Sequence, residues 1–202
     1  MNIVIPINSH YLKHRYQVDH NFLVLLENEV IPALVDRLSS DDRIFAIEII
    51  SDINFHELSE SYCKLVANRA DLSGHFEASE VARRIFEVRF SNDDILILLN
   101  PLYPFVKVDS INEAYVGVLH GKANSAIGAL TSREAVGVSK TAPIEDIGIF
   151  TVFRKTFFET FGERVVPPVE MIGLNALELV SFRSKKDIEL YELIVNSGFE
   201  IV

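Results

Sequence analysis

Short apolar runs alternate along the chain with longer segments in which apolar side chains recur every three or four residues. The short runs are rich in valine, isoleucine and leucine, as buried strands are. The run over residues 93–100 is the most apolar, and we expect it in the middle of a sheet. The predicted strands are 2–7, 43–52, 93–100, 124–132 and 146–154.

The segments with helical spacing predict helices that bury one apolar face. Pro32 is compatible with a helix only in its first turn, Gly162 is suited to end a helix, and Ser184 is suited to cap one. Residues 55–69 fit either a helix or a helix leading into a short strand, and the polar residues 8–21 are expected to form a loop. The predicted helices are 29–40, 78–90, 108–121, 155–162 and 184–198.

Strands that alternate with helices predict an α/β fold, a three-layer αβα sandwich with a mainly parallel, Rossmann-like sheet. The 202 residues fit a single domain with a full hydrophobic core. In such sheets, ligands bind beyond the carboxyl ends of the strands. This rule points to the loop after Ile7, the turn after Leu99 and the loop beyond the strand 146–154.

Charge and composition narrow the possible partners. The net charge of −10 argues against nucleic acid and anionic membranes, because both attract basic surfaces. The single cysteine, Cys63, rules out an intramolecular disulfide framework and fits a reducing compartment. The first residues do not resemble a signal peptide, and no apolar run approaches the ~20 residues of a membrane helix. We therefore expect a cytoplasmic protein.

Three segments carry a resemblance to a known family. Residues 5–8 read Ile-Pro-Ile-Asn, residues 21–25 read Asn-Phe-Leu-Val-Leu, and residues 98–105 read Leu-Leu-Asn-Pro-Leu-Tyr-Pro-Phe. In order along the chain, they resemble motifs of the acylneuraminate cytidylyltransferases, the CMP-sialic acid synthetases and their relatives. The chain is more distantly similar to the CMP-Kdo synthetases. The spacing of the two prolines in the last segment is the most specific of these likenesses.

The resemblance implies a nucleotidyltransferase reaction, in which a sugar hydroxyl attacks the α-phosphate of CTP and releases pyrophosphate. An active enzyme of this kind uses Mg²⁺ to neutralise the triphosphate. The implied partners are CTP or a CMP-sugar, and a homodimer is possible. The arm through which relatives form dimers is expected to be short or absent here, because only residues 133–145 occupy its place.

Candidate site residues are carried over from the resemblance by position. Each allows a second interpretation: the basic residues can be solvated surface charges, and Tyr103 can fill space rather than contact a ligand. Asn100 replaces a glutamine of the family and keeps an amide donor and acceptor. The nucleotide-binding candidates are Asn8, Ser9, Lys13, Arg15 and Arg69, and the sugar-binding candidates are Asn100 and Tyr103.

The chain departs from the family where the chemistry is done. It has no glycine before Gly74, so a glycine loop that brings backbone close to phosphate is missing. Relatives carry Ile-Asp-Ile-Asp-Thr where residues 180–184 read Val-Ser-Phe-Arg-Ser, so Ser181 and Arg183 replace the two metal-binding aspartates. An arginine would repel Mg²⁺ but can pair directly with a phosphate. Asp187 is explained by its place in the first turn of a helix.

Two hypotheses follow from these departures. The first is a degenerate cytidylyltransferase-like protein with weak or no catalysis, with no metal site, associated with surface-glycan sugar metabolism. The second is an active, divergent cytidylyltransferase that recruits Mg²⁺ through Asp52, Asp146, Asp187 or the triphosphate alone. A serine hydrolase elbow, a Walker loop and a Rossmann glycine fingerprint are all missing from the sequence.

Overall fold

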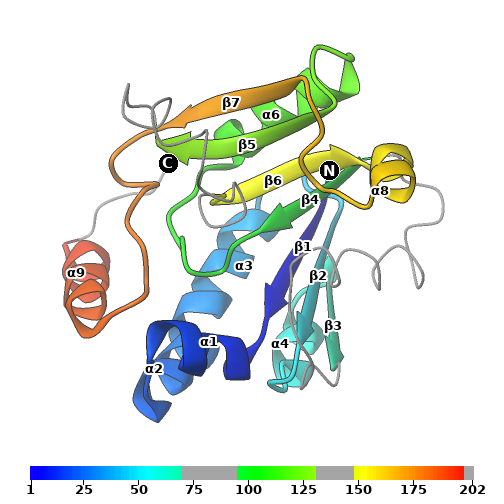
Figure 1. The fold of residues 1–202 in the computed structure, drawn as a ribbon. Helices are drawn as coiled ribbons and strands as arrows, with labels where there is room; N and C mark the ends of the chain where they lie inside the picture. Colours follow the sequence, from blue (N-terminus) through cyan, green and yellow to red (C-terminus); the bar gives the residue numbers. More distant parts are fainter. Residues whose placement is uncertain (70–94, 131–147, 198–202) are drawn as a thin grey trace.

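The computed structural model describes residues 1–69, 95–130 and 148–197 (Figure 1). In this part of the chain, seven strands form one mixed sheet in the order β3-β2-β1-β4-β6-β5-β7. Strand β6 runs antiparallel to both of its neighbours, whereas the other pairs are parallel. The strands are β1 (Asn2–Ile7), β2 (Ala46–Ser51), β3 (Leu65–Arg69), β4 (Ile95–Leu99), β5 (Ser125–Leu130), β6 (Phe150–Arg154) and β7 (Val169–Leu174).

Helices connect most of these strands, and their ends follow the expected sequence signals. Pro32 lies in the first turn of α3, immediately after a π-helical turn, since proline supplies no N–H to continue a regular helix. Gly162 ends α8 with a φ of 72°, and Ser184 caps α9. The helices are α1 (Ser9–Tyr16), α2 (His20–Leu25), η1 (Leu26–Val30, π-helical), α3 (Ile31–Ser39), α4 (His56–Ser61), α6 (Val108–Leu119), α8 (Lys155–Phe161) and α9 (Lys185–Asn196).

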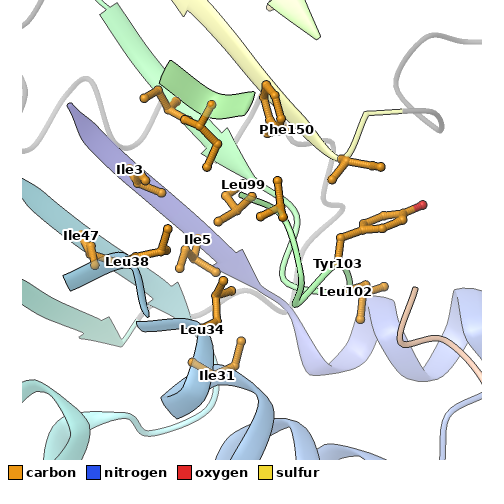
Figure 2. Close-up of a cluster of buried hydrophobic side chains, with 14 of the residues drawn as sticks. Ile3, Ile5, Ile31, Leu34, Leu38, Ile47, Leu99, Leu102, Tyr103 and Phe150 are labelled. Carbon is orange, nitrogen blue, oxygen red and sulfur yellow. The ribbon is translucent and has the colours of Figure 1, made fainter. Parts of the chain in front are cut away.

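The main core lies between the sheet and α3. In Figure 2, Ile31, Leu34 and Leu38 of α3 lie against Ile5 and Ile47 of the central strands, and all five side chains are buried. Apolar side chains at i, i+3 and i+7 of the helix meet alternate side chains of the strands, as the two periodicities require. The buried residues of α6 belong to the same core cluster, so α3 and α6 cover one face of the sheet.

Helix α8 lies against the opposite face. Phe158 of α8 packs on Phe153 of β6, with ring centroids 5.7 Å apart. Because successive strand residues point to opposite faces, Phe153 faces away from Val152, which belongs to the main core. Helices therefore cover both faces, which confirms the three-layer αβα sandwich with a mainly parallel sheet.

Two expectations from the sequence are wrong, and one strand was missed. Residues 8–21 are not a loop, because α1 and the start of α2 lie there. Strand β7 was not expected: its alternation of buried and exposed residues is short and contains Gly173. The loop beyond the strand 146–154 is not at the ligand edge, because antiparallel β6 pairs its last residue, Arg154, with Ile95 at the start of β4.

Other expectations hold or fall outside the described residues. The central place of β4 is confirmed, and residues 55–69 form helix α4 leading into strand β3. Three predicted segments lie outside the described part of the chain: the helix 78–90, residues 131–132 at the end of the strand 124–132, and the shortened arm over 133–145.

Candidate functional site

Four strands bring their carboxyl ends to one edge of the sheet. Parallel pairing places Ile7 of β1 beside Ser51 of β2, and Ser51 beside Arg69 of β3. Strand β4 is also parallel to β1 and ends at Leu99. The segments that follow these strands, including Asn8 and Asn100, therefore share the edge at which open α/β sheets bind ligands.

A carboxylate from β2 fixes the start of α1. The backbone N–H of Ser9 donates to Asp52 Oδ1 at 2.8 Å, and the Ser9 hydroxyl donates to Asp52 Oδ2 at 2.6 Å. Leu12 N–H donates to the carbonyl of Asn8 at 3.0 Å, which closes the first turn, and the Leu12 side chain is buried. Both oxygens of Asp52 are therefore engaged in holding the start of α1, where the sequence resemblance implied a phosphate loop.

The nucleotide-binding candidates are spread along this edge. Asn8 and Ser9 are partly exposed at the junction of β1 and α1, and Lys13 is exposed on α1. Arg15 lies in α1, and Arg69 is the last residue of β3. The structure thus brings Asn8, Ser9 and Lys13 to one short segment, with Arg69 two strands away in the sheet.

The turn after β4, residues 100–107, is packed as part of the core. Asn100 Oδ1 accepts the N–H of Leu102 at 3.1 Å, and the Asn100 carbonyl accepts the N–H of Tyr103 at 3.2 Å. Every residue from Pro101 to Val106 is buried. The amide oxygen of Asn100 therefore shapes the turn, which was not part of its predicted role.

The partly buried Arg37 and the buried Glu178 brace this turn from outside. Arg37 Nη2 donates to the carbonyls of Pro104 at 2.6 Å and Val106 at 3.0 Å. Burial lowers the pKa of Arg37 to about 10, with an opposing contribution from Tyr191 and Glu178. Two backbone carbonyls thus accept from this half-buried guanidinium at Nη2, whereas its Nε is buried without a partner.

Glu178 holds the far end of the turn. Its side chain is 2% exposed, and its Oε1 accepts the N–H of Lys107 at 3.0 Å and the hydroxyl of Ser110 at 2.6 Å. Its Oε2 accepts the N–H of Asn175 at 3.1 Å. A buried carboxylate with three donors is well satisfied, so Glu178 is a structural group rather than a free acid.

Residues 175–184, which we call the strap, cross the turn. The N–H of Phe182 donates to the carbonyl of Leu102 at 2.7 Å. The Phe182 side chain is fully buried, with its ring centroid 4.6 Å from that of Phe22 and 5.5 Å from that of Tyr191. The strap therefore joins the turn, α2 and α9 into one packed unit.

Arg183 of the strap lies between two tyrosines. Its Cζ is 4.9 Å from the ring centroid of Tyr103 and 5.3 Å from that of Tyr16 in α1. Arg183 Nη2 also donates to the Tyr103 hydroxyl, whereas its Nε is buried without a partner. Burial raises the pKa of Tyr103, and the charge of Arg183 opposes that rise. The cluster of Tyr16, Tyr103 and Arg183 thus closes the space beside the turn, and Figure 2 shows the Tyr103 hydroxyl directed away from Ile5 and Leu99.

The carboxylates near this edge do not fit a Mg²⁺ site. Asp187 Oδ2 accepts the backbone N–H groups of Arg183 and Ser184, each at 2.9 Å, in a capping box that starts α9. Asp52 is engaged by Ser9, and Asp146 lies outside the described residues. Within the described ranges, no three histidine, cysteine or acidic side chains gather in a way that would hold a metal ion. Hard cations need several oxygen ligands, and these residues do not provide them together.

Sequence reasoning missed several residues that organise the site. Tyr16, Arg37, Glu178 and Phe182 were not singled out, and nothing in their local pattern marks them, because their partners lie far away in the chain. Asp52 was considered only as a metal ligand. Its position as the last residue of the predicted strand 43–52 was the available signal, since such residues lie at the ligand edge.

The comparisons with known proteins concern the fold. A 4-diphosphocytidyl-2C-methyl-D-erythritol synthase from Anaerococcus prevotii is 13% identical, with a TM-score of 0.66 over 96% of this chain and 95% of that one. A 2-C-methyl-D-erythritol 4-phosphate cytidylyltransferase from Francisella tularensis is 14% identical, with a TM-score of 0.60 over 95% and 98%. A cytidylyltransferase from Leptospira borgpetersenii is 10% identical, with a TM-score of 0.60 over 98% and 94%.

These likenesses show that the chain has the α/β fold of nucleotidyltransferases, and specifically the fold found in solved cytidylyltransferases. No family model and no curated protein sequence matches the chain. None of the neighbours named above is described as an acylneuraminate enzyme, so the broad fold expectation is confirmed while the particular family remains a prediction. A search of the described helices for one that is both long and apolar enough to cross a membrane found none.

Proposed function

We propose that this protein is a degenerate cytidylyltransferase-like protein that binds a cytidine nucleotide or CMP-sugar, with weak or no transfer activity. The observation that carries the proposal is that the aspartates near the ligand edge are already engaged in hydrogen bonds. Asp52 and Asp187 both serve as hydrogen-bond acceptors for the backbone, and Arg183 stands where the resemblance implies a metal-binding aspartate. Positive charge from the protein thus replaces positive charge from a metal.

The ligand edge of the sheet is the proposed binding place. Asn8, Ser9 and Lys13 are the candidates for contact with phosphate oxygens, because they are partly or fully exposed beyond β1. Tyr103 and Asn100 are the candidates for the sugar side. The pathway that we propose, metabolism of surface-glycan sugars, and a homodimer rest on the resemblance of the sequence alone.

The second candidate is an active cytidylyltransferase for an acidic sugar. It is favoured by the fold, which solved synthases and cytidylyltransferases share over nearly their whole length. This function would require Mg²⁺ to be held by the triphosphate alone, by Asp146, or by Asp52 or Asp187 after either leaves its present donors.

Calorimetry with CTP, in the presence of Mg²⁺ and in the presence of EDTA, tests both candidates. The degenerate protein is expected to bind CTP in EDTA and to release no pyrophosphate with acidic sugars. Steady pyrophosphate release with CTP and an acidic sugar would overturn this proposal and establish the active alternative. Failure of CTP to bind under either condition would exclude both and direct attention to protein partners.

A further inference from the structure

A half-buried cation without an acidic partner stands at the ligand edge. Among the described residues, the Arg183 guanidinium donates to the Tyr103 hydroxyl, and its Nε is buried with no acceptor. Asp187 at the start of α9 turns one oxygen to the backbone N–H of Arg183, not to its guanidinium. In the described part of the chain, no carboxylate lies within ion-pair distance of this group. Removing an unpaired charge partly from water costs free energy, unless an anion pairs with it.

Two aromatic faces hold the guanidinium in place. The Cζ of Arg183 lies 5.3 Å from the ring centroid of Tyr16 and 4.9 Å from that of Tyr103, whose hydroxyl accepts from its Nη2, and these three contacts restrict the side chain. A fixed, planar group with several free N–H donors matches the geometry of phosphate oxygens. The arrangement therefore favours an anion over a neutral ligand.

A second cation lies one helical turn away. Lys13 and Tyr16 are three residues apart in α1, so their side chains are neighbours on the helix surface, and Lys13 is exposed. Arg183 against Tyr16 and Lys13 one turn earlier give two positive groups along the same rim. Two cations in succession suit two linked phosphates better than a single one.

From this arrangement we propose that Arg183 and Lys13 form a phosphoanhydride-binding site that works without a divalent cation. The ligand class is a nucleoside di- or triphosphate, or pyrophosphate itself. Arg183 provides the fixed contact beside the Tyr103 hydroxyl, and Lys13 provides a mobile one. The identity of the nucleoside rests on the proposed function, whereas the anion contact rests on the geometry of these side chains alone.

The test is calorimetry of the full chain in EDTA, with inorganic pyrophosphate, CTP and GTP as probes. Wild type is expected to bind pyrophosphate, and Arg183→Met is expected to weaken that binding about 10- to 100-fold, as loss of a charge-assisted hydrogen bond does. Lys13→Met is expected to weaken it about 2- to 5-fold, because an exposed charge contributes less. Arg43→Met, which removes an exposed arginine paired with Asp41 and Asp109, is the matched control and should leave binding unchanged.

A second variant separates binding from folding. Arg183→Lys keeps the charge but lacks the planar group that stacks, so it is expected to stay folded and to bind more weakly than wild type but better than Arg183→Met. Binding of pyrophosphate that is equal in wild type and Arg183→Met would overturn the inference. Binding of CTP in EDTA that is equal in wild type and Arg183→Met, with none of pyrophosphate, would overturn it and leave the proposed function standing. Binding of pyrophosphate through Arg183 with no preference for CTP over GTP would support the inference and remove the cytidine-specific function.

Discussion

The segments that follow the neighbouring strands β1 and β4 are built in opposite ways. The turn after β4 is buried from Pro101 to Val106 and is held from outside by Arg37 and Glu178. The start of α1 after β1 is partly exposed and is held by one carboxylate, Asp52. Both lie at the edge where ligands bind in such sheets, yet one resembles core and the other resembles a binding surface.

The difference distinguishes residues that stabilise the fold from residues that can bind a ligand, whereas the sequence resemblance assigned both segments to ligand binding. A residue that is buried and fully hydrogen-bonded contributes to stability, and a ligand cannot reach it without rearrangement. A partly exposed polar residue contributes less to stability and is free to contact a ligand. Changes around the β4 turn should therefore act on folding, and changes around α1 should act on binding. The predictions below test this division, starting with the largest expected effect.

Removing the ring of Phe182 should have the largest effect on stability. Phe182 is fully buried between Phe22 and Tyr191, so Phe182→Ala leaves a cavity where the strap meets the turn. We expect a loss of about 3–5 kcal/mol in the free energy of unfolding, measured by urea denaturation. Phe45→Ala is the control, because Phe45 is 80% exposed, and its effect should stay within about 0.5 kcal/mol. Similar losses in both variants would show that the strap is not anchored by Phe182.

Changing Glu178 to glutamine should have the next largest effect. In wild type, the two carboxylate oxygens accept the backbone N–H groups of Lys107 and Asn175. In Glu178→Gln, the amide NH₂ replaces one of these oxygens and faces one of the two N–H donors. The change also removes a negative charge near Arg37. We expect a loss of about 2–3 kcal/mol in the free energy of unfolding. The matched variant is Glu192→Gln, on an exposed position of α9, and its denaturation midpoint should not move. An unchanged midpoint for Glu178→Gln would mean that the turn does not depend on this carboxylate.

The sequence predicted the turn and the order of elements better than it predicted the roles of individual residues. The strand 93–100 and the helix 108–121 could be located because buried strands and amphipathic helices leave periodic patterns. Helix α1 could not, because its start depends on Asp52, which is 43 residues away in the chain. The same reason hides Arg37, whose acceptors lie 67 and 69 residues further on.

The candidate site was predictable only in part. Asn8 and Ser9 do lie at the ligand edge, since the strand before them was recognisable. Of the two interpretations left open for Tyr103, its 9% exposure shows that the side chain fills space, while a contact with the sugar stays a proposal. The contact between Tyr103 and Arg183 joins residues 80 positions apart, and no local sequence pattern predicts such a contact.

Removing the carboxylate of Asp52 tests the exposed side of the comparison. Asp52→Ala leaves the N–H and hydroxyl of Ser9 without their acceptor, and we expect a loss of about 1–2 kcal/mol in the free energy of unfolding. Asp52→Asn keeps one acceptor oxygen, so it should restore most of that stability.

The same pair of variants distinguishes the two candidate functions. If Asp52 only positions α1, the Mg²⁺ dependence of CTP binding in Asp52→Asn should equal that of wild type. A selective loss of Mg²⁺-dependent binding in Asp52→Asn, with stability retained, would assign Asp52 to the metal and favour the active enzyme.

The smallest effect is expected at the surface, where Arg43 ties the start of α6 to the residues before β2. The hydrogen bond from Arg43 holds the pKa of Asp41 at about 2, below its ordinary value of 3.8. A depressed pKa means that the contact stabilises the fold above about pH 4 and that this contribution is lost as the pH falls toward 2. Asp41→Asn should therefore be less stable than wild type at pH 7, by less than Phe182→Ala, Glu178→Gln or Asp52→Ala because Arg43 is exposed, and the difference should shrink as the pH falls. Denaturant midpoints at pH 7 and pH 3 measure it, with Asp42→Asn as the neighbouring control. A difference that is constant with pH would show that the charge of Asp41 does not stabilise its contact with Arg43. The backbone hydrogen bonds around residues 41–44 would then be the polar support of this segment.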